Sequence, residues 1–316
     1  MRHARFLAVA PLLGALALAA SGCSIKRMAV NGVGNSLTTG PSVFETDDDI
    51  ELVGDALPFS LKLLEMLLNE SPDHRGLLLS ACKGYTLYAY AYVQRAAEAG
   101  AEDDIMKSRE AAARARKLYL RALGFGLRGL ETCSPGITAA LVKTPAEAVA
   151  KTGKDDVPLL YWSAAALGLA VSANKGDAEM IARLPEVEAL LLRGLKLDEA
   201  WDGGSLHEFA ITFAAASPAA TPNPAALKVH FDRSLALSQG KRASLFVTWA
   251  ESVSIQRQNR PEFKAMLDRA LAVDVEAAPN LKLSNQIALR RARWLATRAD
   301  KLFLEDESPA TEGKTP

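Results

Sequence analysis

The residue types that most often carry out chemistry are few in this sequence, and their spacing completes no catalytic or metal-binding motif. His207 followed by Glu208 begins like the zinc-binding helix of many metalloproteases, but Ile211 stands where that helix needs its second histidine. Gly240 and Lys241 form a Gly-Lys pair without the upstream glycines of a phosphate-binding loop. We therefore predict no metal site and no cofactor.

No motif for covalent catalysis is present either. The sequence contains neither a Gly-x-Ser-x-Gly nucleophile elbow nor a Cys-x-x-Cys pair. Paired carboxylates such as Asp155 and Asp156 stand beside predicted turns, where they most simply cap helices. The prediction is that the protein is not an enzyme. A fold can still assemble an acid and a base from distant positions, so an uncommon histidine-dependent hydrolase stays open as an alternative.

Composition and charge define the broad class. Lys+Arg 37 and Asp+Glu 37 leave a formal net charge of +0, without the excess of cations that a nucleic-acid interface needs. Hydrophobic residues make up 49% of the chain, enough for a large core. Aromatic residues supply only 6%, whereas Ala and Leu are abundant, which favours helix over strand. We expect a helical globular protein that binds no nucleic acid.

The N-terminal residues have the pattern of an export signal. Arg2 and Arg5 precede an apolar run over residues 6–20, which is shorter than the roughly 20 residues that a membrane-spanning helix needs. We predict that residues 1–22 are a cleaved signal peptide. No other segment is both long enough and apolar enough to span a bilayer.

The end of this signal resembles a bacterial lipobox. Small residues directly precede Cys23, which in that motif is acylated and becomes the first mature residue. We predict a lipid anchor on Cys23, with Ser24 favouring delivery to the outer membrane and a body that faces the periplasm. An ordinary signal-peptidase site with an incidental cysteine is the alternative.

Three regions follow the signal. Residues 23–45 are rich in Gly, Ser, Thr and Asn without an apolar period, which predicts a flexible tether. Residues 46–305 carry successive helix signals, and residues 306–316 are predicted to be a disordered tail. Cys82, in an apolar run, is predicted to be a core thiol, although a disulfide with Cys133 is the alternative in an oxidising compartment.

Several helix boundaries can be predicted from local signals. Thr46 before three aspartates is expected to cap the first helix, and Pro58 is expected to start or kink a helix. Asn223 before Pro224 is a typical cap-then-proline start.

A five-residue pattern of Arg, small, Leu, any residue and apolar occurs four times. The copies begin at Arg121, Arg193, Arg233 and Arg269. Their spacings are 72, 40 and 36 residues, and 72 is two units of 36. Intervals of this length with helical content are typical of tetratricopeptide-like helix pairs, and each copy resembles the end of a second helix. We predict an all-α fold, a tetratricopeptide-like helical-hairpin solenoid with degenerate repeats, which leaves a concave face for ligands.

Beyond these periodic features, local motifs occur in an order that resembles one known family. They include Cys23-Ser24, Ala56-Leu57-Pro58-Phe59, Asp156-Val157-Pro158-Leu159-Leu160-Tyr161-Trp162, Gly203-Gly204-Ser205-Leu206-His207, His230-Phe231, and Arg291-Ala292 with Trp294-Leu295. Together they resemble the T component of tripartite ATP-independent periplasmic (TRAP) transporters. The resemblance runs from about Cys23 to Phe303.

The resemblance implies a lipoprotein that associates with the periplasmic solute-binding protein of a TRAP transporter. It also implies a homotrimer that holds or passes a small hydrophobic or carboxylate ligand. A general outer-membrane scaffold for protein–protein interaction is the alternative function.

Four residues are the candidate ligand-binding positions under this resemblance. Arg291 would suit a carboxylate by bidentate hydrogen bonding, and an interhelical or solvated Arg291 is the simpler interpretation. Tyr161 and Trp162 would form a pocket wall, although large aromatic residues on an Ala-rich helix are more often core. His207 is the fourth candidate.

Overall fold

The structure is a computed structural model, and it describes residues 26–38, 40, 42–100, 104–174, 176–216 and 223–304. The predicted signal peptide, Cys23 and the predicted tail lie outside these residues. Every regular element among the described residues is helical, which confirms the all-α prediction. None of the described helices combines the length and the apolar character needed to cross a bilayer.

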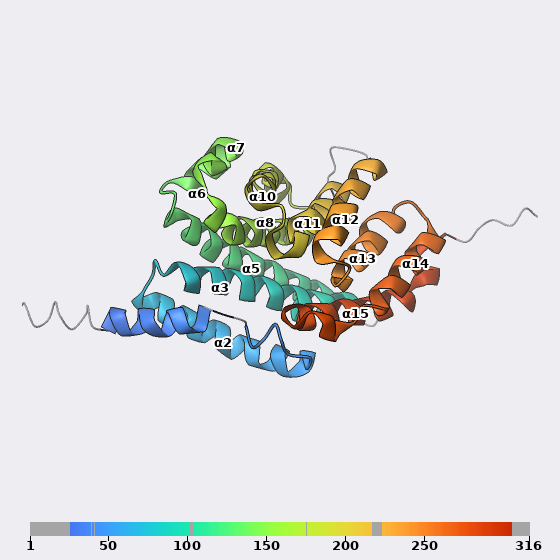
Figure 1. The fold of residues 1–316 in the computed structure, drawn as a ribbon, viewed down its shortest axis with the longest axis horizontal. Helices are drawn as coiled ribbons and strands as arrows, with labels where there is room; N and C mark the ends of the chain where they lie inside the picture. Colours follow the sequence, from blue (N-terminus) through green and yellow to red (C-terminus); the bar gives the residue numbers. More distant parts are fainter. Residues whose placement is uncertain are drawn as a thin grey trace, which may run out of the picture. The chain divides into compact units, whose positions relative to one another are not determined.

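The described residues divide into two compact units, a subdivision that the sequence did not predict. The first unit comprises residues 26–38, 40, 54–100, 104–174 and 176–190, and the second comprises residues 42–53, 191–216 and 223–304. Figure 1 shows the helices of both units.

The first unit contains a helix over residues 26–38, most of α2, α3 to α9, and the start of α10. The bounds are α2 (Ile50–Glu70), α3 (Arg75–Tyr88), η1 (Ala89–Gln94), α4 (Arg95–Ala99), α5 (Ile105–Glu131), α6 (Ile137–Lys143), α7 (Pro145–Ala148), η2 (Val149–Lys151), η3 (Lys154–Asp156), α8 (Val157–Ser172), α9 (Ala178–Ile181) and α10 (Leu184–Asp198). Within this unit α3 packs on α5 and α8, and α5 packs on α8.

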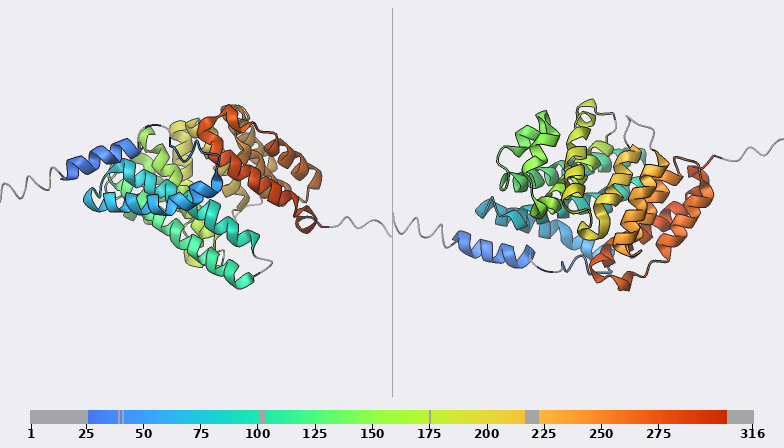
Figure 2. Two further views of the ribbon diagram at one scale, coloured as in Figure 1. Left: turned by 90° about the horizontal axis from the view of Figure 1, so that it is seen from below. Right: turned by 45° about the horizontal axis from the view of Figure 1, so that its top comes forward.

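The second unit contains the helices from η4 onward. Their bounds are η4 (Trp201–Gly204), α11 (Ser205–Ala216), α12 (Pro224–Ser238), α13 (Ala243–Trp249), η5 (Ala250–Ser254), α14 (Arg260–Leu271), η6 (Val275–Ala277), η7 (Pro279–Leu281), α15 (Lys282–Ala296) and α16 (Ala299–Leu302). Helices that follow one another along the chain pack in pairs here: α11 on α12, α13 on α14, and α14 on α15. Figure 2 shows this succession from two further sides.

The first helix boundaries differ from those predicted. Helix α2 begins at Ile50, because the carboxylate of Asp49 accepts a hydrogen bond from the backbone N–H of Leu52 at 2.9 Å. Asp49 is therefore the cap, and the prediction for Thr46 is wrong. Pro58 lies inside α2 instead of starting a helix. One face of α2 is buried on both sides of Pro58, and this burial holds the helix together across the missing hydrogen bond.

Two other local predictions have clear outcomes. Asn223 caps α12 as expected, since its side-chain oxygen accepts from the backbone N–H of Ala225 at 3.0 Å. Residues 26–38 form a helix, whereas the composition predicts a flexible tether over residues 23–45. This helix makes polar contacts with the rest of the first unit, including a hydrogen bond of 2.6 Å that the hydroxyl of Ser71 donates to the side-chain oxygen of Asn31. Such contacts leave no apolar period in the sequence.

The first unit is packed around small side chains where α3, α5 and α8 cross. A Cβ placed on Gly126 would lie 2.3 Å from the hydroxyl oxygen of Ser163 and 2.9 Å from the sulfur of Cys82. Cys82 is fully buried and burial raises its pKa to about 12, which keeps the thiol protonated. Cys82 and Cys133 are both free, so the prediction of a core thiol is confirmed for Cys82 and the disulfide alternative is wrong.

Three of the four repeat copies lie where a helix ends. The copies that begin at Arg193, Arg233 and Arg269 fall at the ends of α10, α12 and α14, whereas the copy at Arg121 lies inside α5. The small residue after Arg193 is Gly194, where a Cβ would meet Leu206 at 2.8 Å. The small position therefore does allow the following helix to approach closely. The tetratricopeptide-like character of the stack stays a prediction.

A tight left-handed turn connects α10 to α11. Asp202, Gly203 and Gly204 have φ angles of 47°, 60° and 88°. A Cβ on Gly204 would also lie 3.0 Å from the backbone Cα of Ser234 on α12. Both the turn and the approach of α12 therefore require glycine at this position.

We predict that Gly204→Ala destabilises the protein more than Gly240→Ala does. Gly240 has a φ of 72°, but the nearest atom to its virtual Cβ is 3.9 Å away, so an alanine there meets only backbone strain of about 1 kcal/mol. At Gly204 the collision with α12 adds to that strain, and we expect a loss of about 2–4 kcal/mol. Urea denaturation of the two variants measures both values. Equal losses would contradict the close approach at Gly204.

Candidate functional site

Two histidines meet in the second unit, within a group that we call the histidine cluster: Glu199, His207, His230 and Arg233. Nδ1 of His207 lies 2.8 Å from Nδ1 of His230, and Nε2 of His207 lies 3.2 Å from Oε2 of Glu199. Arg233 donates to the other oxygen of Glu199. Helix α11 supplies His207, α12 supplies His230 and Arg233, and Glu199 follows the end of α10.

The tautomers of the two rings are linked through this cluster. With His207 neutral and its Nε2–H donating to the carboxylate of Glu199, Nδ1 of His207 accepts from Nδ1–H of His230. Protonation of His207 at Nδ1 would require His230 to carry its proton on Nε2 instead of Nδ1. The contacts therefore accommodate two neutral imidazoles.

Electrostatics supports the neutral state. Burial lowers the pKa of His207 below its ordinary value of 6.5, and the carboxylate of Glu199 only partly opposes this shift. The pKa of His230 is also lowered, first by burial and then by its neighbour His207. Arg233 and His207 together lower the pKa of Glu199, which stays ionised. The cluster thus ties three successive helices together through one carboxylate.

A second polar group lies beside the left-handed turn. The guanidinium of Arg242, only 7% exposed, donates to the backbone oxygen of Asp202 and lies 3.2 Å from its carboxylate. Glu208 accepts from the hydroxyls of Ser244 at 3.0 Å and Thr248 at 3.1 Å. Burial raises the pKa of Glu208, although the charge of Arg242 opposes the shift. These contacts link the turn and α11 to α13.

The structure places Arg291 in an interhelical ion pair. Its Nε and one terminal nitrogen donate to the same oxygen of Glu251, at 2.9 and 2.5 Å. Its guanidinium also stacks over the ring of Trp294, 4.1 Å from the centroid. A carboxylate ligand at Arg291 would therefore have to displace the protein's own carboxylate.

The two aromatic candidates belong to the first unit. Tyr161 and Trp162 are half-buried on α8 and pack edge to face, with centroids 5.0 Å apart. The ammonium of Lys83 lies 5.7 Å from the Trp162 ring. His207 and Arg291 belong to the second unit and contact different partners. Tyr161 and Trp162 therefore contact each other, whereas His207 pairs with Glu199 and Arg291 pairs with Glu251.

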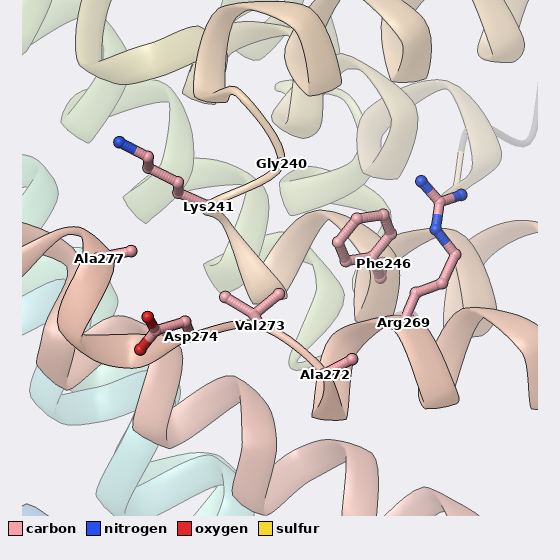
Figure 3. Close-up of a pocket in the computed structure, with 8 residues that line it drawn as sticks. All are labelled: Gly240, Lys241, Phe246, Arg269, Ala272, Val273, Asp274 and Ala277. Carbon is pink, nitrogen blue, oxygen red and sulfur yellow. The ribbon is translucent and has the colours of Figure 1, made fainter.

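An open pocket of about 270 Å³ lies elsewhere in the second unit. Its lining residues are Gly240, Lys241, Phe246, Arg269, Ala272, Val273, Asp274 and Ala277. Figure 3 shows Phe246 and Val273 between Arg269 at one end and Lys241 with Asp274 at the other. The Arg269 guanidinium stacks on Phe246 at 4.3 Å. Arg269 forms no ion pair with a carboxylate in the part of the chain that the structure describes.

This pocket combines an apolar surface with an accessible cation. Arg269 is exposed and its nearest polar contact is the sulfur of Met266, at 3.9 Å. An arginine with free donors beside an aromatic ring suits a carboxylate that carries an apolar group. Among the described residues, no group of three or more His, Cys, Asp or Glu side chains could hold a metal ion.

The pocket does not follow from the sequence, although two of its residues carry a signal. Arg269 opens the last repeat copy, and Lys241 belongs to the Gly-Lys pair, for which the sequence predicts a helix start after a turn instead of a phosphate loop. Phe246 gave no signal that separates it from a core residue, and it is only 4% exposed. Glu199 of the histidine cluster carries no sequence signal either. Its pairing with His207 and Arg233 depends on the turn that follows it.

These features define the class as an all-helical protein whose polar clusters join successive helices and whose open pocket offers an arginine beside an aromatic ring. The model of one protein family, TRAP transporter T-component, matches residues 46–303. A protein of Treponema pallidum (strain Nichols), named only "Uncharacterized protein", is 31% identical over 308 residues, covering 91% of this chain and 95% of that protein. The chain belongs to the TRAP transporter T-component family, a family of transporter components, which confirms the resemblance seen in the sequence.

The histidine cluster predicts how stability depends on pH. Because the pKa values of both histidines are lowered in the folded protein, the unfolded chain takes up their protons at higher pH than the native protein does. The contribution of the cluster is therefore complete above about pH 6.5 and is lost as the pH falls below it.

We expect the Tm of the wild type to fall between about pH 8 and 5, and to fall less in the variant H207Q/H230Q. Glutamine keeps hydrogen-bonding capacity but cannot titrate in this range. Thermal melts followed by circular dichroism across the pH series provide the comparison. Parallel curves for the two proteins would show that the histidines are not held neutral.

Proposed function

We propose that this protein is the periplasm-facing accessory lipoprotein of a TRAP transport system and that it associates with the periplasmic solute-binding protein of that system. The observation that carries the proposal is the family match over residues 46–303, which includes every described helix from α2 to α16. A homotrimer belongs to the same proposal. In this function the protein binds and positions other molecules and performs no catalysis.

The proposed location rests on the predicted acylation of Cys23. The residue lies three positions before Lys26, where the first described helix begins, so an acyl chain on Cys23 would hold the body close to the bilayer. Ser24 favours the outer membrane. Stable attachment follows from more than one acyl chain.

The proposed architecture is a degenerate tetratricopeptide-like stack. Two features support it: the repeat copies at the ends of α10, α12 and α14, and the packing of consecutive helices in the second unit. Such stacks bury their core between neighbouring pairs and bind partners on exposed faces.

For the ligand we propose a small carboxylate with an apolar group, bound in the pocket beside Phe246 and Arg269. The guanidinium of Arg269 would donate to the carboxylate while Val273 and Ala272 contact the apolar part. This assignment replaces Arg291 with Arg269 as the cation, because Arg291 already pairs with Glu251.

The partner proposal predicts a specific complex. The acylated protein, purified in mild detergent, should retain a TRAP solute-binding protein. The partner to test is one whose gene lies beside the gene for this protein and the genes for TRAP membrane subunits. It should not retain a solute-binding protein from an unrelated transporter, which is the matched control. Size-exclusion chromatography of the mixed proteins measures the complex. Absence of this complex together with recovery of envelope assembly proteins would favour the general scaffold.

The ligand proposal predicts a selective loss. Hexanoate should bind the wild type, and Arg269→Gln should weaken its binding roughly tenfold or more, since a hydrogen bond to a charged group contributes about 1.5–3 kcal/mol. Hexanol lacks the carboxylate and should bind the wild type and Arg269→Gln equally. The control Arg293→Gln changes an exposed arginine of α15 that does not line the pocket. Calorimetric titration distinguishes these cases, and unchanged hexanoate binding in Arg269→Gln would exclude the pocket.

A further inference from the structure

Helix α2 has two apolar faces, and only one of them is covered. Val53, Leu57, Leu61 and Leu68 are buried on one face. On the opposite face Phe59, Leu63 and Met66, at positions i, i+4 and i+7, are 75%, 37% and 65% exposed. We call these three residues the α2 stripe. Large apolar side chains that share an exposed helix face indicate a contact surface.

The α2 stripe leads toward the predicted lipid anchor. Glu70 follows Met66 by one helical turn on the same face, and its carboxylate pairs with the ammonium of Lys26 at 2.7 Å. Lys26 begins the helix over residues 26–38, and Cys23 precedes it by three peptide units. Three residues span at most about 11 Å. An acyl chain on Cys23 would therefore leave the protein beside the end of the α2 stripe.

The helix over residues 26–38 also has exposed apolar side chains. Val33 and Leu37 are 51% and 54% exposed. They share one helix face with Lys26, at positions i+7 and i+11, and Lys26 pairs with Glu70 of α2. The segment nearest the anchor therefore presents apolar side chains to its surroundings.

We propose that the α2 stripe inserts into the surface of the lipid leaflet that holds the acyl chains of Cys23, so that the first unit lies on the membrane in one orientation. This inference rests on the acylation included in the proposed function. Acyl chains hold the protein at a lipid surface, and Cys23 lies within about 11 Å of Lys26, whose ion pair with Glu70 is one helical turn from Met66 at the end of the stripe. Lys62, which is exposed beside the stripe, pairs through its ammonium with Glu65 at 2.9 Å, and its methylenes can contact acyl chains.

Photo-crosslinking tests the proposal in the intact lipoprotein. p-Benzoylphenylalanine is incorporated in place of Phe59 in the full chain, which is expressed in a Gram-negative bacterium and irradiated in isolated outer membranes. The matched control carries the same photoreactive residue in place of Val142, an exposed apolar residue of α6 in the same unit. We expect mass spectrometry to find phospholipid adducts at position 59 at least tenfold more often than at position 142.

Two results would overturn the proposal. Crosslinks from position 59 to a second copy of the chain would show that the stripe is an interface between subunits. Adducts at position 59 no more frequent than at position 142 would show that the stripe faces water. A second variant with the photoreactive residue in place of Met66 checks each result if the change at Phe59 perturbs folding.

The same samples separate this inference from the proposed anchor. The mass of the N-terminal peptide reports whether Cys23 is acylated. An acylated Cys23 without lipid adducts at the stripe would overturn the stripe alone. An unacylated Cys23 would overturn the anchor, and with it the reason for the stripe to meet a membrane.

Discussion

The close approach of neighbouring helices is the constraint on which the rest of this structure depends. In the first unit α5 meets α8 at Gly126 and Gly129, where a Cβ would collide with Ser163 and Leu159. In the second unit the turn at Gly204 contacts the backbone of α12. Helices this close bury the side chains between them at interior packing density, and most polar groups buried in a protein find a partner within it.

The polar clusters follow from that constraint. The two histidines share a hydrogen bond, His207 also contacts the carboxylate of Glu199, and Arg242, Glu208 and their partners form a second polar group. Partial burial lowers the pKa values of the histidines and raises that of Glu208 because each group is more stable without charge. These residues connect helices, so the charged groups available to other molecules are at the periphery, as Arg269 is in the pocket.

The sequence predicted much of the fold and little of the site. Helical character followed from composition, and three repeat copies lie at helix ends as their pattern suggested. The cap at Asp49 instead of Thr46 depends on which carboxylate reaches the backbone N–H of Leu52, and the continuation of α2 through Pro58 depends on the burial of α2. Local sequence signals predicted neither. No local sequence signal distinguishes Arg291 from Arg269. Only their neighbours show that Arg291 is paired with Glu251 and that Arg269 stands beside the open pocket.

By itself the sequence determined the all-α class and the family, because both depend on patterns of adjacent or periodically spaced residues that a local reading can detect. The tertiary structure decided which charges are satisfied and which apolar face of α2 stays uncovered. These properties arise from residues far apart in the chain, such as Glu251 with Arg291 or Lys26 with Glu70, and no local pattern encodes such pairs.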